Sequence, residues 1–357
     1  MIGGMAAANG AAWLRKGLCT LGLAMLAAGS NAGEPNAQRV SHFVGAAGES
    51  IPIQVPPFHG IEPRLSLSYS SEARNGFAGM GWNLTGFSVI ERGNGLYGFP
   101  TEEDTQVFTL DGQGVRPCPA SSNYPSCATG GTHYTHQESY LRIKKVSDVL
   151  WQVFGKDGTR TDFEPVYNEL TLPTFRLGQK RVVDTHGNEV LYNWVVNAGG
   201  INGNTYLSSI AYSEYNIQFF REARPDLQTR PGLTDVFRAG DRLKSVVVKQ
   251  GNDNIRAYKL TYTTSATGKS LLASVQMYGK DVAVDVTGSI TGGTALPAQT
   301  FSYQADAALA SFTGDVTMSS SGPPAATASE PIVWIYRHNT VTVGTGNTLQ
   351  SLSDPGQ

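Results

Sequence analysis

The sequence predicts an all-β protein in which antiparallel hairpins and meanders form an open, shell-like domain. Three observations carry this prediction. Glycine accounts for 41 of 357 residues, well above its average share of about 7 per cent. Charged residues make up only 16% of the chain. Almost every periodic segment alternates with a period of two residues, as strands do, and none beyond residue 32 has the pattern of a long amphipathic helix.

The first clear strand lies at residues 65–69, where Leu and Tyr alternate with Ser. The segment 82–90 also alternates, but its apolar parity changes at Gly86, which predicts a β-bulge there. Residues 141–163 are expected to form a meander with a tight turn at 155–158.

A loose repeat follows residue 180. Three segments share the form Leu-x-Ser-Ile/Val and read as strands of successive hairpins, namely 207–212, 243–248 and 272–277.

The amino terminus has the pattern of a secretory signal peptide over residues 1–32. Two basic residues precede the apolar run 17–28, which is too short to span a bilayer. Small residues Ser30 and Ala32 place cleavage between Ala32 and Gly33. The alternative for the apolar run is a buried helix. We therefore expect a secreted protein that passes through the periplasm, with no transmembrane span.

Charge and cysteine content agree with this address. Without residues 1–32 the chain has 25 Lys and Arg against 29 Asp and Glu, a net charge of −4, and no basic stripe for nucleic acid. Two cysteines remain, Cys118 and Cys127, on either side of a loop rich in Pro, Ser and Asn. In an oxidising compartment we expect a disulfide between them; two free thiols are the alternative.

The expected domain organisation has three parts after the signal peptide. Residues 33–305 form the β-domain, and 306–331 form a linker rich in small residues and proline. Two short apolar pieces within 332–357 are expected to begin a further β-module that is cut short, so that the chain is one part of a larger shell.

Three glycines follow the strand at 65–69, at Gly76, Gly79 and Gly81. A phosphate-binding glycine loop must open a helix, whereas here another strand pattern follows and no Lys-Ser/Thr pair is present. The glycines are expected instead to let two strands meet closely.

Other candidate chemistry is weak. His133, His136 and Glu138 lie close in sequence, but the spacing is not a metal-binding one, since positions i and i+3 of a strand face opposite ways. The acidic run 102–104 is expected to be a solvated turn rather than a calcium site or a pair of glycosidase carboxylates. No nucleophile, base and orienting group assemble, so we expect no catalytic residue, no metal and no cofactor.

Residues 50–92 resemble the start of the amino-terminal domain of the virulence-plasmid B protein (SpvB) family. The same domain begins the B component of insecticidal toxin complexes and is related to RHS/YD-repeat proteins. The resemblance extends over residues 40–305, through a Gly-x-Gly-Trp step, a YD-like segment at 184–194, and the segments 104–112, 151–163, 221–226 and 241–248. The residues that carry the motif are Gly76, Gly79, Gly81, Trp82, Asp184, Gly187, Asn188 and Tyr192.

The resemblance implies a non-catalytic β-shell or scaffold of a secreted toxin or virulence-associated surface protein. Such a shell would house or present a carboxy-terminal effector and would assemble with other toxin segments or subunits. The ADP-ribosyltransferase of SpvB lies in a different, later domain, so its activity is not carried over. The alternative is a secreted carbohydrate-binding or adhesive β-module, because 15 Tyr and 5 Trp could supply stacking platforms for sugars or bind a host surface.

Overall fold

The computed structural model shows an all-β architecture, which confirms the predicted fold class. It describes residues 39–40, 46–93, 107–121, 123–166, 176–196, 198, 205–231 and 236–303. The expected signal peptide, linker and terminal module lie outside these ranges, as does the acidic run at 102–104.

A small antiparallel sheet begins the fold and has the order β1-β2-β3-β6. Its strands are β1 (Arg39–Val40), β2 (Ala47–Pro52), β3 (Ser66–Ser70) and β6 (Trp82–Thr85). Between β3 and β6 lies a short hairpin of β4 (Asn75–Gly76) and β5 (Gly79–Met80).

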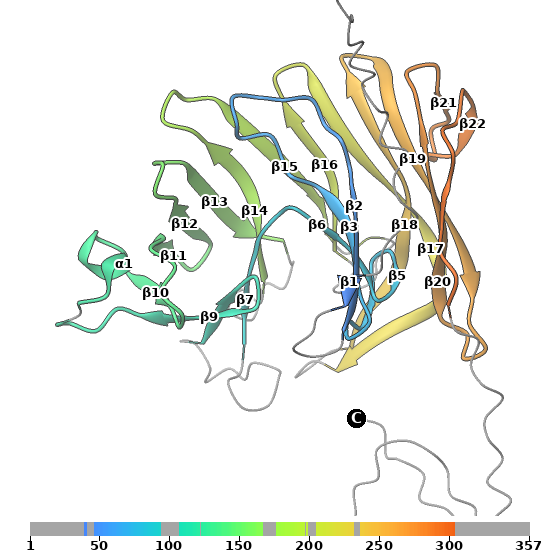
Figure 1. Ribbon diagram of the computed structural model, residues 1–357. Coiled ribbons are helices and arrows are strands. Elements are labelled where there is room, and N and C mark those ends of the chain that lie inside the picture. Colours follow the sequence, from blue (N-terminus) through green and yellow to red (C-terminus); the bar gives the residue numbers. More distant parts are fainter. Residues whose placement is uncertain are drawn as a thin grey trace, which may run out of the picture.

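The large sheet contains a closed ring of strands. The ring runs from β7 through β14, and it closes because β14 pairs with both β13 and β7. Figure 1 shows it as the green part of the molecule. Its strands are β7 (Val89–Arg92), β8 (Phe108–Leu110), β9 (Gln113–Pro117), β10 (His133–Thr135), β11 (Arg142–Ser147), β12 (Leu150–Phe154), β13 (Arg160–Pro165) and β14 (Arg176–Val183). A four-residue helix, α1 (Pro125–Ala128), lies between β9 and β10.

The rest of the large sheet continues from the same strand. On one edge, β14 pairs with β7 through residues 176–178 and with β15 through residues 181–183. From there the strands follow in chain order: β15 (Glu189–Val195), β16 (Tyr206–Tyr212), β17 (Tyr215–Pro231), β18 (Val236–Gln250), β19 (Asp253–Thr264), β20 (Ser270–Tyr278) and, across a crossover, β23 (Gln299–Thr300). The second half of the sheet is therefore open, as the sequence predicts, while the first half closes on itself.

Two large cores and one small one follow from this topology. The first lies between the small sheet and strands β14 to β20, where Leu67 and Trp82 pack with residues such as Ile217 and Val246. In Figure 1 the blue strands of the small sheet accordingly lie across the green and yellow strands. The second core fills the ring and is formed by Ile90, Phe108, Leu110, Val115, Ile143, Trp151, Val153, Phe163 and Leu177.

A short hairpin covers the opposite face of the large sheet. It consists of β21 (Ala283–Val284) and β22 (Ile290–Gly292), and it packs on Val247, Ala257 and Tyr278. The sheet is thus covered on both faces at β18, where the consecutive residues Val246, Val247 and Val248 are all buried.

Four hairpins share one five-residue turn, in which glycine has the fourth position. Residue one accepts the N–H of the glycine and donates its own N–H to residue five. Each glycine has a positive φ, between +76° and +85°, which explains the preference for glycine there. The turns are 155–159, 184–188, 265–269 and 285–289.

The predicted bulge at Gly86 is wrong. β6 belongs to the small sheet and β7 to the ring, so Gly86 is the corner at which the chain passes from one sheet to the other. Its φ is +104°, and a Cβ there would collide with the carbonyl oxygen of Arg64. The corner takes the chain from the first core, which Phe87 still contacts, to the core of the ring, into which Ile90 of β7 packs.

The clustered glycines allow the β4–β5 hairpin to approach other backbone closely. A Cβ on Gly76 would overlap Asn83, and one on Gly79 would lie 2.9 Å from the carbonyl oxygen of Ser270 in β20. Gly81 has a φ of +76°, and a Cβ there would lie 2.9 Å from the carbonyl oxygen of Ser70. The N–H of Leu243 in β18 donates to the carbonyl of Phe77, so the hairpin contacts both β18 and β20.

We expect Gly79→Ala to lower the free energy of unfolding by about 2–4 kcal/mol, since it combines a strained φ of +100° with a backbone clash. Gly187→Ala is the matched control. Gly187 also has a positive φ, but a Cβ there meets nothing within 4 Å, so the cost should be about 1 kcal/mol. Urea denaturation measures both. Equal losses in the two variants would contradict the close approach of the hairpin to β20.

Candidate functional site

The histidine pair suggested by the sequence does not form a metal site. His133 is buried on β10, whereas His136 is exposed beyond the end of that strand. Glu138 is occupied elsewhere, because it accepts hydrogen bonds from the Ser126 hydroxyl at 2.5 Å and from the Tyr140 N–H at 2.7 Å. Among the residues that the structure describes, no three His, Cys, Asp or Glu side chains are grouped to hold a metal ion.

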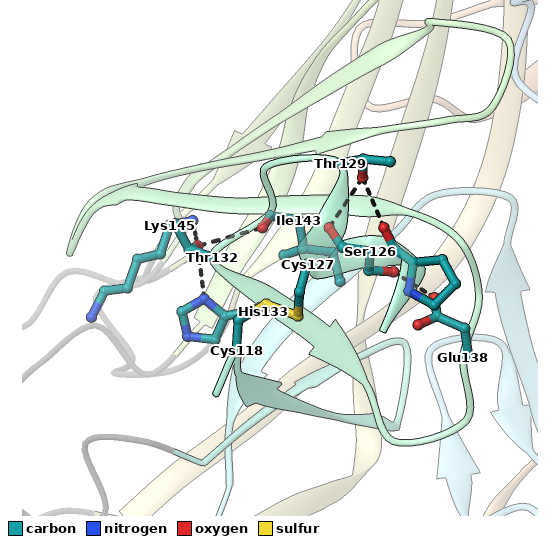
Figure 2. Close-up of a disulfide and its surroundings, with 10 residues drawn as sticks. Cys118, Ser126, Cys127, Thr129, Thr132, His133, Glu138, Ile143 and Lys145 are labelled. Atoms are coloured by element: carbon teal, nitrogen blue, oxygen red, sulfur yellow. Dashed lines mark hydrogen bonds between the residues drawn. A yellow bond between two sulfur atoms is a disulfide. The ribbon is translucent and has the colours of Figure 1, made fainter. Parts of the chain in front are cut away.

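Cys118 and Cys127 are joined by a disulfide, with their Cα atoms 5.8 Å apart. Cys118 follows the end of β9 and Cys127 lies in α1 (Figure 2). Both side chains are half-buried beside exposed loop residues. The bond therefore ties the helix to the adjoining strand of the ring.

His133 lies inside the ring against aromatic side chains. Its ring centroid is 4.7 Å from that of Trp151 and 6.4 Å from that of Phe108. Its Nδ1 shares a hydrogen bond of 2.9 Å with the Thr132 hydroxyl. Burial, and in second place the charge of Lys145, lowers the pKa of His133 to about 4. His133 is thus a neutral core residue at physiological pH.

The strongest electrostatic feature is a buried ion pair between Arg224 and Asp226, both on β17. Their side chains are 1% and 2% exposed, and Arg224 Nε lies 3.0 Å from Asp226 Oδ1. Four residues of β17, Arg224 to Leu227, form a wide bulge in the ladder with β18. The bulge places both charged side chains toward the β4–β5 hairpin.

The hairpin provides partners for both charges. Arg224 donates to the Gly76 carbonyl at 3.1 Å and to Asn75 Oδ1 at 2.6 Å. The Asn75 amide in turn donates to Asp226 Oδ2 at 2.7 Å. The ion pair therefore fastens the hairpin from the side of β17.

Strand β20 completes the network. The hydroxyl and the N–H of Ser270 donate to the two oxygens of Asp226, at 2.5 and 2.8 Å. Burial by itself raises the pKa of Asp226, but the hydrogen bonds from Arg224, Ser270 and Asn75 outweigh it and hold the pKa well below its usual range. The carboxylate is therefore ionised and fully hydrogen-bonded. This state suits a structural contact and not a proton donor.

The segment 221–226 carries part of the family resemblance, but the sequence pattern assigns no role to Arg224, Asp226 or Ser270. The sequence signal for this ion pair is an Arg-Pro-Asp segment within a strand. Pro225 cannot donate to a ladder, which predicts a bulge, and residues i and i+2 share one face. Ser270, the partner of Asp226, lies 44 residues further along the chain and has no such signal.

Trp82, the last residue of the Gly-x-Gly-Trp motif, is buried in the first core. It is 1% exposed, and its indole N–H donates to the Tyr303 hydroxyl at 2.9 Å. Tyr303 donates to the carbonyl of Leu272 in β20 at 2.8 Å. These bonds join the small sheet to the last described residues of the chain.

The YD-like segment forms the β14–β15 hairpin. Asp184 Oδ1 accepts the N–H groups of His186 and Asn188, and Asp184 Oδ2 accepts the Asn188 side-chain amide at 2.7 Å. Gly187 has the position of positive φ in this turn, and Tyr192 is buried in the first core. These residues build a turn and a strand, and each of their side chains has a structural role.

Residues 41–205 match the family model described as Salmonella virulence plasmid 65kDa B protein, SpvB. The chain resembles the SpvB family. This match and the solved structures confirm the recognition made from the sequence. The comparison with curated proteins found no match.

Solved structures share the fold at low sequence identity. The N-terminal domain of effector protein SpvB from Salmonella typhimurium is 16% identical, with a TM-score of 0.51 over 65% of this chain and 98% of that one. The TcdB2-TccC3-TEV crystal structure is 17% identical, with a TM-score of 0.59 over 78% of this chain. The Photorhabdus luminescens Tc holotoxin pore is 17% identical, with a TM-score of 0.55 over 73% of this chain.

The toxin-complex chains are much longer than the matched region. The alignment covers 17% of the TcdB2-TccC3-TEV chain and 16% of the holotoxin chain. Across the ranges described here, the structure also contains no helix with the length and hydrophobicity of a transmembrane span.

We expect Asp226→Asn to lower the free energy of unfolding by about 3–5 kcal/mol, because it leaves Arg224 buried without a counter-charge. Asp241→Asn is the matched control. The pair of Asp241 with Arg221 is 23% exposed on each side, so its loss should cost about 1 kcal/mol or less. Chemical denaturation followed by circular dichroism measures both. A loss below about 1 kcal/mol for Asp226→Asn would show that the network does not fasten the hairpin.

His133 should make stability depend on pH. An unfolded histidine binds a proton near about pH 6.5, whereas folded His133 stays neutral until about pH 4. The unfolded state alone takes up this proton as pH falls, so the free energy of unfolding should decrease from about pH 6.5 to about pH 4. We expect His133→Gln to flatten this dependence, as measured by urea midpoints across the window. His136→Gln, at an exposed position, should leave it unchanged; the opposite ranking would exclude His133 as the cause.

Proposed function

We propose that the chain is the non-catalytic β-shell, or scaffold, of a secreted SpvB/RHS-type toxin or virulence-associated surface protein. It houses or presents a carboxy-terminal effector that lies outside this chain. The observation that carries the proposal is the extent of the fold match: the chain covers 98% of the SpvB N-terminal domain, and the same fold recurs as a part of much longer toxin-complex chains.

The chemistry of the described residues supports a scaffold. Both oxygens of Asp226 accept hydrogen bonds and Arg224 is occupied by three partners, so neither is free to act on a substrate. Perturbed pKa values mark catalytic sites when they lie in a cleft, but they also arise in structural ion pairs. Here the ion pair joins three segments of the fold through hydrogen bonds to Asn75, Gly76 and Ser270.

The proposal includes partners and an address. The partners are other segments or subunits of a toxin-complex or RHS-like assembly, with no nucleic acid and no cofactor. The protein is secreted after passing through the periplasm, which accords with the disulfide between Cys118 and Cys127.

A second candidate function, glycan binding, is favoured by one surface feature. Tyr124 and Tyr134 stack with ring centroids 4.1 Å apart and an interplanar angle of 14°, and Tyr124 is 43% exposed. Stacked tyrosines at a surface are suited to the apolar face of a sugar ring. Trp82 and Trp151 are buried and cannot serve in this way.

Reconstitution tests the scaffold role. The full chain is mixed with the separately purified effector chain of its own secretion system and examined by size-exclusion chromatography with light scattering. We expect one co-eluting species in which the effector resists protease. An effector that elutes alone and is digested at its usual rate would contradict the proposal.

A glycan array on the same protein distinguishes the second candidate. Binding that is lost in Tyr124→Ala but retained in Tyr140→Ala would support a glycan site at the stacked pair. Tyr140 is the matched control because it is also exposed, at 54%, and lies in a different loop. If no glycan on the array binds and the effector co-elutes with the chain, the scaffold role is supported and the glycan-binding role is rejected.

A further inference from the structure

The ring of strands has one narrow join, between β10 and β11. These strands share a single residue pair, His133 with Ile143. By comparison, β13 and β14 share six pairs, and β9 and β10 share three. Ladder hydrogen bonds therefore contribute least to ring closure at this join.

Thr132 reinforces the join from outside the strand. Its N–H donates to the Ile143 carbonyl at 2.8 Å, and its hydroxyl accepts the N–H of Lys145 at 2.8 Å. Figure 2 shows Thr132 between β11 and the disulfide. Closure of the ring between β10 and β11 thus depends on the position of the segment that precedes β10.

Helix α1 and its surroundings hold that segment. The N–H of Gly131 and the hydroxyl of Thr129 both donate to the Ser126 carbonyl, at 3.1 Å. Ser126 is 1% exposed and donates to Glu138, which lies between β10 and β11. A four-residue helix has almost no stability of its own, so these contacts need an external restraint.

The disulfide is that restraint. Cys127 lies in α1, and Cys118 lies directly after β9, where its N–H donates to the Thr132 carbonyl at 2.9 Å. The bond thereby connects the segment that carries Thr132 to the strand on the other side of β10. Both cysteine residues are half-buried and lie next to exposed residues, which leaves the bond open to attack by a small thiol.

We propose that the Cys118–Cys127 disulfide is a thiol-exchange site that controls closure of the ring at the β10–β11 join. A thiolate of a small reductant, of the glutathione or dithiol class, attacks one sulfur and forms a mixed disulfide. A second reductant thiol resolves it. The balance is one protein disulfide and two reductant thiols giving two protein thiols and one reductant disulfide.

Reduction releases α1 and the segment that ends at Thr132. The β10–β11 pairing then loses the support of Thr132 and opens. The cluster formed by His133, Phe108 and Trp151 lies at this end of the ring and gains access to water when the join opens. The ring is then closed in an oxidising compartment and open at one join in a reducing one. This device is independent of the scaffold role.

Hydrogen exchange on the full chain tests the proposal. Oxidised protein is compared with protein treated with dithiothreitol under native conditions, with thiol titration to confirm that two thiols are released. The amides of Thr132 and Lys145 should exchange faster by roughly a hundredfold. This is the change in the opening equilibrium that corresponds to the loop-closure entropy of so small a loop. The amide of Leu243, in the other core, should be unchanged.

Variants separate the bond from the reagent. The double variant Cys118→Ala/Cys127→Ala should exchange like reduced protein and ignore dithiothreitol. Ser121→Ala, an exposed position in the same loop, should behave like the unaltered protein. If the double variant does not fold, the dithiothreitol comparison decides alone. Two released thiols with unchanged exchange at Thr132 and Lys145 would overturn the proposal, as would a disulfide that resists reduction until the protein is denatured.

Discussion

The ion pair of Arg224 and Asp226 is the interaction on which the arrangement of the open half depends. It lies where the glycine-rich hairpin, β17 and β20 meet, and its partners come from two other parts of the chain, the hairpin and β20. A buried ion pair is costly unless its hydrogen bonds are all formed. Asn75 and Ser270 supply those bonds, so the network is stable only when the three segments are in register. It therefore acts on the specificity of the fold as well as on its stability.

Strand β14 links the two halves of the large sheet. One edge pairs along its length with β13, and the other edge is divided between β7 and β15. This division lets a closed ring and an open sheet share a strand without leaving a free edge at their junction. The two cores remain separate because residues of the ring face inward, while those of the open half face the small sheet or the β21–β22 hairpin.

The polar groups of the described chain are used to join segments. Turn aspartates such as Asp184 accept hydrogen bonds from their own hairpin, and Glu138 fixes helix α1 beside the ring. Aromatic residues are divided between the cores and a stacked surface pair at Tyr124 and Tyr134. These contacts maintain the shape of the fold.

The sequence by itself determined the local features. Period-two alternation located most strands, and the turn at 155–158, with its glycine Gly158, marked a hairpin, because both depend on a few neighbouring residues. Tertiary structure decided the rest. Closure of the ring, the corner at Gly86, and the pairing of Asp226 with Ser270 depend on which distant segments meet. A carboxylate or a glycine has the same local preferences in every such arrangement, so only the packed fold specifies its partner.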